Sequence, residues 1–264
     1  IERGLQVGTV AGKVVPVLLG SAASGIGVAT LLDRIIGELP APTEAPHKIG
    51  DTEIECDPNG PLVGFVFKST ADPYVGKISY VRVFSGKLKV DDHVWNANRE
   101  RDERLHNLYF PHGKAQETAV EVVAGDICAL AKLQDTHTGD TLSTQKENFK
   151  LPPVQFPDPI YRVAIKPATK ADEDKLGPAL DKLLEEDPTL RHHRDPALKQ
   201  DILEGMGDIH LDSAIEKLKA RFGVTVNTED AKVPYRETIR KSSKAQGKHK
   251  RQTGGKGQYG DCWV

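Results

Sequence analysis

A run of basic and glycine residues near the C-terminus is the stretch of this sequence best suited to hold another molecule. No acidic residue lies between Glu237 and Asp261, whereas residues 240–264 contain seven lysines and arginines. These seven are Arg240, Lys241, Lys244, Lys248, Lys250, Arg251 and Lys256. Glycines punctuate the same stretch at positions 247, 254, 255, 257 and 260. We therefore predict a flexible, cationic loop over Lys244–Gly260 that contacts a polyanion.

The charge of the chain is distributed unevenly. Residues 240–264 carry a formal charge of +6, because Asp261 is their one acid, while the whole chain of 264 residues carries −2. The remaining residues must then carry −8. A basic end on an acidic body is typical of a protein that meets nucleic acid through one region only.

Other patterns with chemical potential lack the partners that their chemistry needs. Gly255–Gly260 fits the spacing GxGxxG, but β-type residues follow it where a dinucleotide fold requires a helix. His193-Arg194-Asp195 matches a kinase triplet, without the downstream Asn and the glycine-rich loop. The pair His192-His193 has no acidic or cysteine partner at metal-ligand spacing. The sequence thus predicts no catalytic residue and no metal site.

The three cysteines and the apolar segments bear on the compartment. Cys56, Cys128 and Cys262 are odd in number and far apart, which indicates unpaired thiols in a reducing compartment. The apolar stretch Val14–Leu19 is too short to span a membrane and is not a convincing signal peptide. We therefore expect a cytoplasmic protein. Because the chain starts at Ile1 without Met and stops inside an apparent strand, we expect it to be a piece of a larger protein.

The first 40 residues have the pattern of the end of an α/β domain. Residues 13–19 form an apolar run without alternation, which predicts a buried parallel strand. A turn follows over Gly20–Gly25, and apolar residues at helical spacing then predict a helix that ends near Gly37 to Pro40. No Gly-Lys-Ser/Thr sequence is present, so the turn is not a phosphate loop. From this stretch alone, an ordinary turn between a strand and a helix is the simpler interpretation.

The next two regions are a linker and a β domain. Residues 41–61 are rich in proline and form the linker. Residues 62–150 contain short β-branched and aromatic segments separated by turn residues, which predicts a closed β-barrel. The strongest strand segments are Leu62–Thr70, Lys77–Gly86, His93–Asn98, Ala119–Val123 and Ile127–Leu133. The alternating charges over Arg99–Arg104 indicate a solvated hairpin.

Residues 158–230 predict a ferredoxin-like unit with the order βαββαβ. A strand over Ile160–Lys166 precedes a helix that Thr169 caps, with Asp172 completing a capping box. We expect Pro178 to kink this helix, or the regular part of the helix to start near Gly177. Two strands follow, and then a second helix, capped by Asp208 and ended by Gly223. Val224–Val226 is the last predicted strand.

Residues 231–264 predict a truncated hairpin. A strand begins at Val233, the basic loop follows, and Gly257–Val264 forms the second arm. The fold class is therefore multidomain α/β plus β. It comprises a terminal strand–helix piece (1–40), a barrel (62–150), a ferredoxin-like domain (158–230) and a partial hairpin domain (231–264).

Taken together, the ordered motifs resemble those of the elongation factor G family of ribosomal translocases. The resemblance covers essentially the whole chain. It rests on Gly20–Ala22, Asp72–Lys77, Arg82–Gly86, Thr138–Leu142, Glu186–Thr189, Gly205–Leu211, Tyr235–Ile239 and Gln252–Gly260. Asp208-Ile209, where Glu-Leu is commoner, and Val233-Pro234 resemble divergent members of the family.

The resemblance implies a function for each region. The first 40 residues would close a GTPase domain of the P-loop class, in which Ser21 and Ala22 contact the guanine base of GTP or GDP held with Mg²⁺. The barrel and the ferredoxin-like unit would be domains II and III, and the basic loop would lie at the tip of domain IV. There Lys248, Lys250, Arg251, Lys256 and Gln258 would contact RNA at the decoding centre, where transfer RNA and messenger RNA meet. The ribosome is the implied partner of a monomeric protein that has no membrane contact.

The same residues leave alternatives open. The phosphate loop, the switch regions and the NKxD motif are absent, so this chain is not expected to bind nucleotide or hydrolyse GTP alone. A ribosome protection or recycling factor would have the same architecture. A non-enzymatic RNA-binding module and a multidomain scaffold with an idle basic run are the other possibilities.

Overall fold

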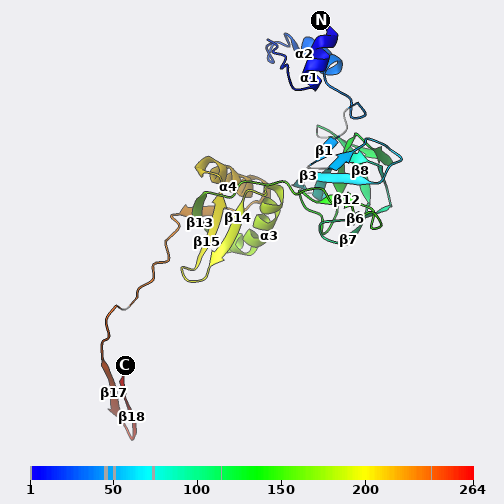
Figure 1. Cartoon of the computed structure of the whole chain (residues 1–264). Helices are drawn as coiled ribbons and strands as arrows, with labels where there is room; N and C mark the ends of the chain where they lie inside the picture. Colours follow the sequence, from blue (N-terminus) through cyan, green and yellow to red (C-terminus); the bar gives the residue numbers. More distant parts are fainter. Residues whose placement is uncertain (1, 45–46, 50–51, 73–74, 114, 239) are drawn as a thin grey trace.

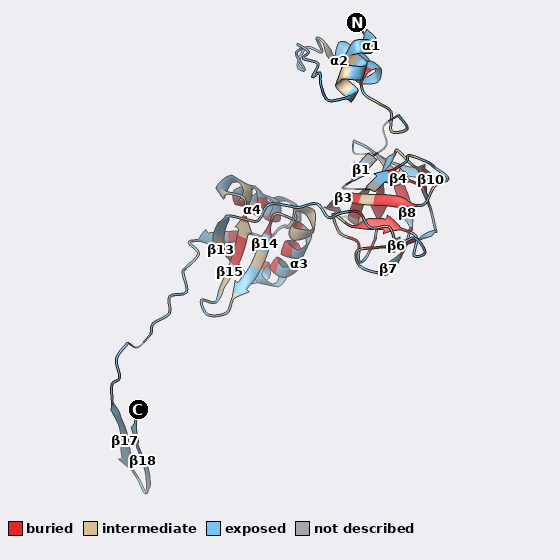
Figure 2. Ribbon diagram, viewed as in Figure 1, coloured by how far each residue is buried: buried red, intermediate tan, exposed pale blue. Residues whose placement is uncertain are grey.

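The chain forms separate bodies strung along its length (Figure 1). The structure, a computed structural model, describes all residues except 1, 45–46, 50–51, 73–74, 114 and 239, and the side chains of residues 47, 49, 52, 253 and 256. Figure 2 shows buried residues gathered inside two of these bodies, while the N-terminal helices and the C-terminal hairpin are almost wholly exposed.

The N-terminal body consists of two helices, α1 (Glu2–Val10) and α2 (Val28–Glu38). Helix α2 confirms the predicted helix, whereas α1 was not predicted. The strand predicted over residues 13–19 is wrong: these residues form no strand and pair with none of the described strands. Val15, Val17 and Leu19 are 81%, 85% and 92% exposed, respectively. A parallel strand needs neighbours on both faces, and the described residues place none beside this segment.

A short hairpin lies within the predicted linker. Strands β1 (His47–Ile49) and β2 (Thr52–Ile54) pair in antiparallel register. Ile54 is buried and packs with Val63 and Leu151 in a small apolar cluster beside the barrel. The second half of the proline-rich segment is therefore fastened to the barrel domain.

The barrel domain is built from ten strands of the described chain. They are β3 (Val63–Asp72), β4 (Gly76–Ser85), β5 (Lys87–Lys89), β6 (His93–Asn96), β7 (Arg101–Arg104), β8 (Asn107–His112), β9 (Ala115–Ala119), β10 (Glu121–Val123), β11 (Ile127–Ala131) and β12 (Thr141–Ser143). Eight of them hydrogen-bond in the order β7-β6-β12-β3-β4-β11-β8-β9, and β5 pairs with β10.

One apolar core fills the barrel. Its side chains come from most of the strands and include Val66, Val81, Leu108, Leu130 and Leu142, all at most 1% exposed. The short β-branched and aromatic segments separated by turn residues were therefore sufficient to predict a barrel around one core. The charged run at 99–104 does form a hairpin, since β7 pairs with β6, but the run is not solvated throughout, because Glu103 is buried.

The ferredoxin-like domain confirms the predicted order βαββαβ. Its elements are β13 (Tyr161–Pro167), α3 (Lys170–Glu186), β14 (Arg191–Asp195), β15 (Gln200–Gly205), α4 (Asp208–Phe222) and β16 (Val226–Glu229). The four strands form an antiparallel sheet in the order β14-β15-β13-β16. Both helices supply buried leucines, among them Leu180, Leu183, Leu211 and Leu218, to one core.

The ends of the two helices correct details of the prediction. Thr169 caps α3 and Asp172 completes the capping box, as predicted. Helix α3 begins at Lys170 and continues through Pro178, so the predicted late start near Gly177 is wrong, while the kink at Pro178 stays a prediction. Pro178 and Asp174 are both exposed, and solvent can therefore satisfy the carbonyl that loses its helical donor. The N-cap of α4 is Gly207 rather than Asp208, and Gly223 ends this helix in the left-handed conformation, as predicted.

The cysteines should differ sharply in reactivity. Burial and the nearby Asp126 carboxylate raise the pKa of Cys128 to about 12, whereas Cys262 is exposed on the last strand. Because the thiolate is the nucleophile, iodoacetamide at pH 8 should alkylate Cys262 in the native chain and spare Cys128 until the barrel unfolds. Peptide mass spectrometry after a timed pulse measures this. Alkylation of Cys128 at the rate of Cys262 would show that the barrel core is open.

Candidate nucleic-acid interface

The basic stretch folds into a two-stranded hairpin. Strands β17 (Gln246–Thr253) and β18 (Lys256–Trp263) pair antiparallel from Gln246 opposite Trp263 to Thr253 opposite Lys256. Gly254 and Gly255 make the connection with φ values of 60° and 78°. Two consecutive positive φ angles are what a type I′ turn requires, and glycine adopts them without steric cost.

This arrangement corrects the predicted one. The predicted loop over 244–260 is itself most of both arms, and the predicted first arm over residues 233–239 forms no strand in its described part, 233–238. Residue 239 lies outside the described residues. The strands were not predicted because their sequence is polar. In the described part of the chain, no apolar core lies beside these exposed strands, so their residues do not alternate between apolar and polar. The Gly-Gly pair flanked by extended segments was the signal that could have revealed the turn.

The register places the predicted RNA-binding side chains on two faces. Successive residues of a strand point to opposite faces, so Lys248 and Lys250 share one face with Tyr259 and Asp261, which lie opposite them in the pairing. Arg251 lies on the other face, opposite Gln258. The predicted RNA-binding residues are thus brought together on one hairpin, but divided between its faces. Lys256 opens β18; its side chain lies outside the described part of the structure.

Polar contacts organise the first face around a single carboxylate. Asp261 accepts hydrogen bonds from Gln246 Nε2 at 2.9 Å and from the Tyr259 hydroxyl at 3.2 Å. Lys248 Nζ lies 3.9 Å from Asp261 Oδ2 and 5.8 Å from the centre of the Tyr259 ring. These contacts hold Lys248 along the strand. Weak surface pairs of this kind are readily exchanged for a stronger anion.

Two cations on the hairpin remain available. Among the residues that the structure describes, Lys250 and Arg251 form no hydrogen bond or ion pair through their side chains, and both are exposed. Tyr259 and Trp263 are also exposed, at 66% and 68%. Exposed cations beside exposed aromatic rings can neutralise phosphates and stack on unpaired bases. The sequence reasoning missed Trp263, which lies on the same face as Lys248 and Lys250.

The predicted guanine-contact residues lie in the N-terminal body. Ser21 and Ala22 sit in a turn that the Ser21 amide closes by donating to the Ile26 carbonyl at 2.9 Å. Both residues are exposed. The turn over residues 20–25 contains no basic side chain for a phosphate. The structure therefore does not combine Ser21 and Ala22 with the hairpin residues in one site.

Other kinds of site find no support in the described ranges. There, no group of three or more His, Cys, Asp or Glu side chains is arranged to hold a metal ion. His192 instead lies 3.4 Å from Asp201 in an ordinary cross-strand contact. None of the described helices is long and apolar enough to cross a bilayer.

Comparisons with known proteins match most of the chain. Residues 61–145 match the family described as elongation factor G domain 2, residues 156–230 match elongation factor G, domain III, and residues 231–264 match elongation factor G, domain IV. A crystal structure from Thermus thermophilus is similar at 39% sequence identity with a TM-score of 0.75. That similarity covers 99% of this chain but 38% of the other, so the chain spans well under half of that relative.

Removing the hairpin cations should weaken RNA binding mainly at low salt. Each phosphate contact with a single strand contributes about 0.7 to the slope of log K against log salt. Changing Lys248, Lys250, Arg251 and Lys256 to Ala should therefore reduce that slope by about 2 to 3. Fluorescence anisotropy with a labelled single-stranded RNA over a salt series measures it. Lys146→Ala with Lys150→Ala, on the barrel, is the control; an equal loss in that control would place the interface elsewhere.

Proposed function

Since this chain belongs to the elongation factor G family, we propose that it is the central part of a translational GTPase that binds the ribosome and couples GTP hydrolysis to movement of transfer and messenger RNA. The observation that carries the proposal is the order of the matched parts, domain 2, domain III and domain IV, with the basic hairpin in the last of them.

The geometry of the hairpin suits contact with structured RNA. Strands of eight residues extend roughly 27 Å, which is long enough to reach into a groove or between RNA elements. Lys250 and Arg251 would contact phosphates without reading sequence, because phosphate contacts carry no base information. Tyr259 and Trp263 offer ring faces to unpaired bases. A sequence-independent tip is what a factor that acts on every codon would need.

In this proposal, the residues of this chain that would contact the guanine nucleotide are Ser21 and Ala22. Their turn is exposed, so it would be accessible to one edge of a base, and it contains no basic side chain for a phosphate. A bound GTP with Mg²⁺ would supply the free energy of phosphoryl transfer in a protein that also carries the phosphate loop. The residues of this chain would then hold the base edge and pass the nucleotide state on through the barrel and the ferredoxin-like domain.

A second candidate is an RNA-binding module that acts without nucleotide. The observation in its favour is that the hairpin is formed by its own cross-strand bonds, apart from the two apolar cores. A factor that protects or recycles ribosomes would also use this architecture. These candidate functions differ in whether binding of the chain to the ribosome affects translocation.

Competition with a complete elongation factor G separates these functions. An excess of this chain should occupy the factor's site on the ribosome and slow translocation, followed by toeprinting of the messenger RNA. The Lys250→Ala, Arg251→Ala double variant should lose most of the inhibition, whereas Lys146→Ala with Lys150→Ala should retain it. If the chain binds ribosomes in sedimentation but leaves translocation unchanged, the RNA-module alternative holds.

A further inference from the structure

The barrel and the ferredoxin-like domain meet where two acidic residues end helix α3. Glu185 and Glu186 both contact the barrel, and Asp187, the next residue, turns back to Thr189 and His210 of its own domain. The barrel side of this contact comes from the ends of β3 and β4 and from the turn that contains His137. Three separate elements of the barrel thus converge on two carboxylates.

Glu185 lies between two cationic or hydrogen-bonding groups of the barrel. Its Oε1 is 2.9 Å from Lys77 Nζ, and its other oxygen contacts the His137 ring. Burial alone would raise the pKa of Glu185, but the hydrogen bonds from His137 and Lys77 outweigh it and hold that pKa below the usual value. Glu185 is therefore ionised at neutral pH. Both Lys77 and Glu185 are about four-fifths buried, so their attraction is less screened than a surface pair.

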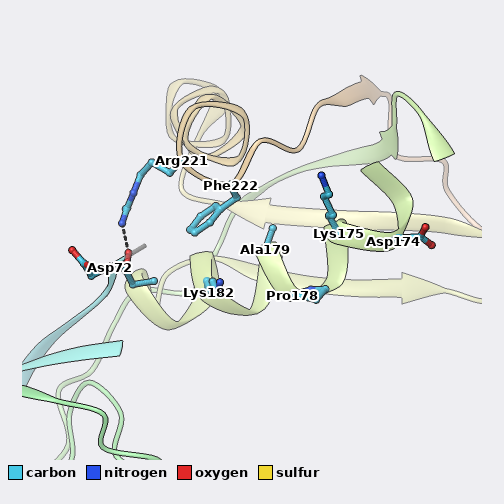
Figure 3. A pocket seen from close by; sticks show the side chains of 9 residues that line it. Asp72, Asp174, Lys175, Pro178, Ala179, Lys182, Arg221 and Phe222 are labelled. Carbon is cyan, nitrogen blue, oxygen red and sulfur yellow. Dashed lines mark hydrogen bonds between the residues drawn. The ribbon is translucent and has the colours of Figure 1, made fainter. Parts of the chain in front are cut away.

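Glu186 and Arg221 together hold the backbone of one barrel residue, Ala71, through both its amide and its carbonyl. The Ala71 amide donates to Glu186 Oε1 at 2.6 Å, and Arg221 Nη2 donates to the Ala71 carbonyl at 2.5 Å. Arg221 Nη1 also donates to Glu186 Oε2 at 2.7 Å, which closes a ring of hydrogen bonds. Figure 3 shows Arg221 extending from the end of α4 to the end of β3. Charged groups that bond the amide and the carbonyl of one residue fix its position as well as its distance.

The barrel presents His137 in a fixed position. Asp140 Oδ2 accepts from the His137 amide at 2.9 Å and from Asn96 Nδ2 at 2.9 Å. Glu103, nine-tenths buried, accepts from the amides of Gln134 and Asp135 in the same turn. The turn is therefore held from within the barrel and is ready to receive Glu185.

No apolar core joins the two domains in the described part of the chain. The buried clusters of the barrel and of the ferredoxin-like domain share no member. Beside the Ala71 contacts lies a cavity of about 370 Å³, lined by charged residues from both domains, including Asp72, Lys175, Lys182 and Arg221 (Figure 3). An interface that no shared apolar core holds depends largely on its ionic contacts and can open without exposing either core.

We propose that Glu185 and Glu186 form an electrostatic latch that fixes the ferredoxin-like domain against the barrel, and that releasing it lets the two domains reorient. Lys77, His137 and the backbone of Ala71 are the barrel half of the latch, and Arg221 of the ferredoxin-like domain acts beside Glu186. Its closed state is favoured at low ionic strength. The latch is a property of the free chain, so it does not depend on the proposed ribosome function.

Pulsed electron paramagnetic resonance on the full chain tests the latch. Spin labels at Glu117→Cys on β9 and Lys217→Cys on α4 report the distance between the domains, in a background of Cys56→Ser and Cys262→Ser. At low salt the unaltered chain should give one narrow distance distribution, which broadens at about 1 M salt, where charges are screened within a few ångströms. Glu185→Lys should broaden it at low salt, because Lys77 and His137 then face a cation. Adding Lys77→Glu should make it narrow again.

Two controls separate the latch from general damage. Glu121→Lys reverses a charge that pairs with Lys89 of the same domain, with Lys89 Nζ 3.1 Å from Glu121 Oε2. This change should leave the interdomain distance unchanged. Labels at His193→Cys and Lys217→Cys, both within the ferredoxin-like domain, should keep their distance if that domain remains folded. A narrow distance distribution in Glu185→Lys would overturn the proposal. So would a distribution for the unaltered chain whose width is the same at low and at high salt.

Discussion

The two-glycine turn at Gly254–Gly255 is the constraint on which the candidate interface depends. Its two positive φ angles set the register in which Lys248 meets Asp261 and Lys250 meets Tyr259. A slip of one residue would move every side chain of one arm to the opposite face. The turn therefore decides which cations and which aromatic rings are offered together to RNA, and it does so without any apolar core behind it.

The rest of the chain carries this hairpin on two folded domains that are joined by a polar interface. The barrel and the ferredoxin-like domain are each stabilised by an apolar core of their own, and ionic contacts at the end of α3 join them. Rigid cores with a polar interface between them can change orientation without unfolding. In the proposed function, such a change would move the hairpin relative to the barrel while each domain keeps its structure.

The sequence predicted those elements whose local pattern and tertiary surroundings agree. The Thr169–Asp172 capping box and the Gly223 helix end formed as predicted, because their hydrogen bonds and backbone angles are local. The strand over 13–19 did not form, since a parallel strand depends on neighbours that its own residues cannot specify. The cations of the candidate site were predicted from composition, but their division between two faces required the register. The interdomain role of Glu185 and Glu186 could not be predicted, because contacts across more than 100 residues leave no local signal.

Cys262, exposed in the hairpin, allows the central claim to be measured directly. An iron chelate attached to this thiol, in a Cys56→Ser background, generates hydroxyl radicals that cleave RNA close to the hairpin when the chain is bound to ribosomes. We predict cleavage of small-subunit ribosomal RNA at the decoding centre, lost when excess complete elongation factor G is added. Cleavage confined to other ribosomal regions, or none above that given by the free chelate, would contradict the account.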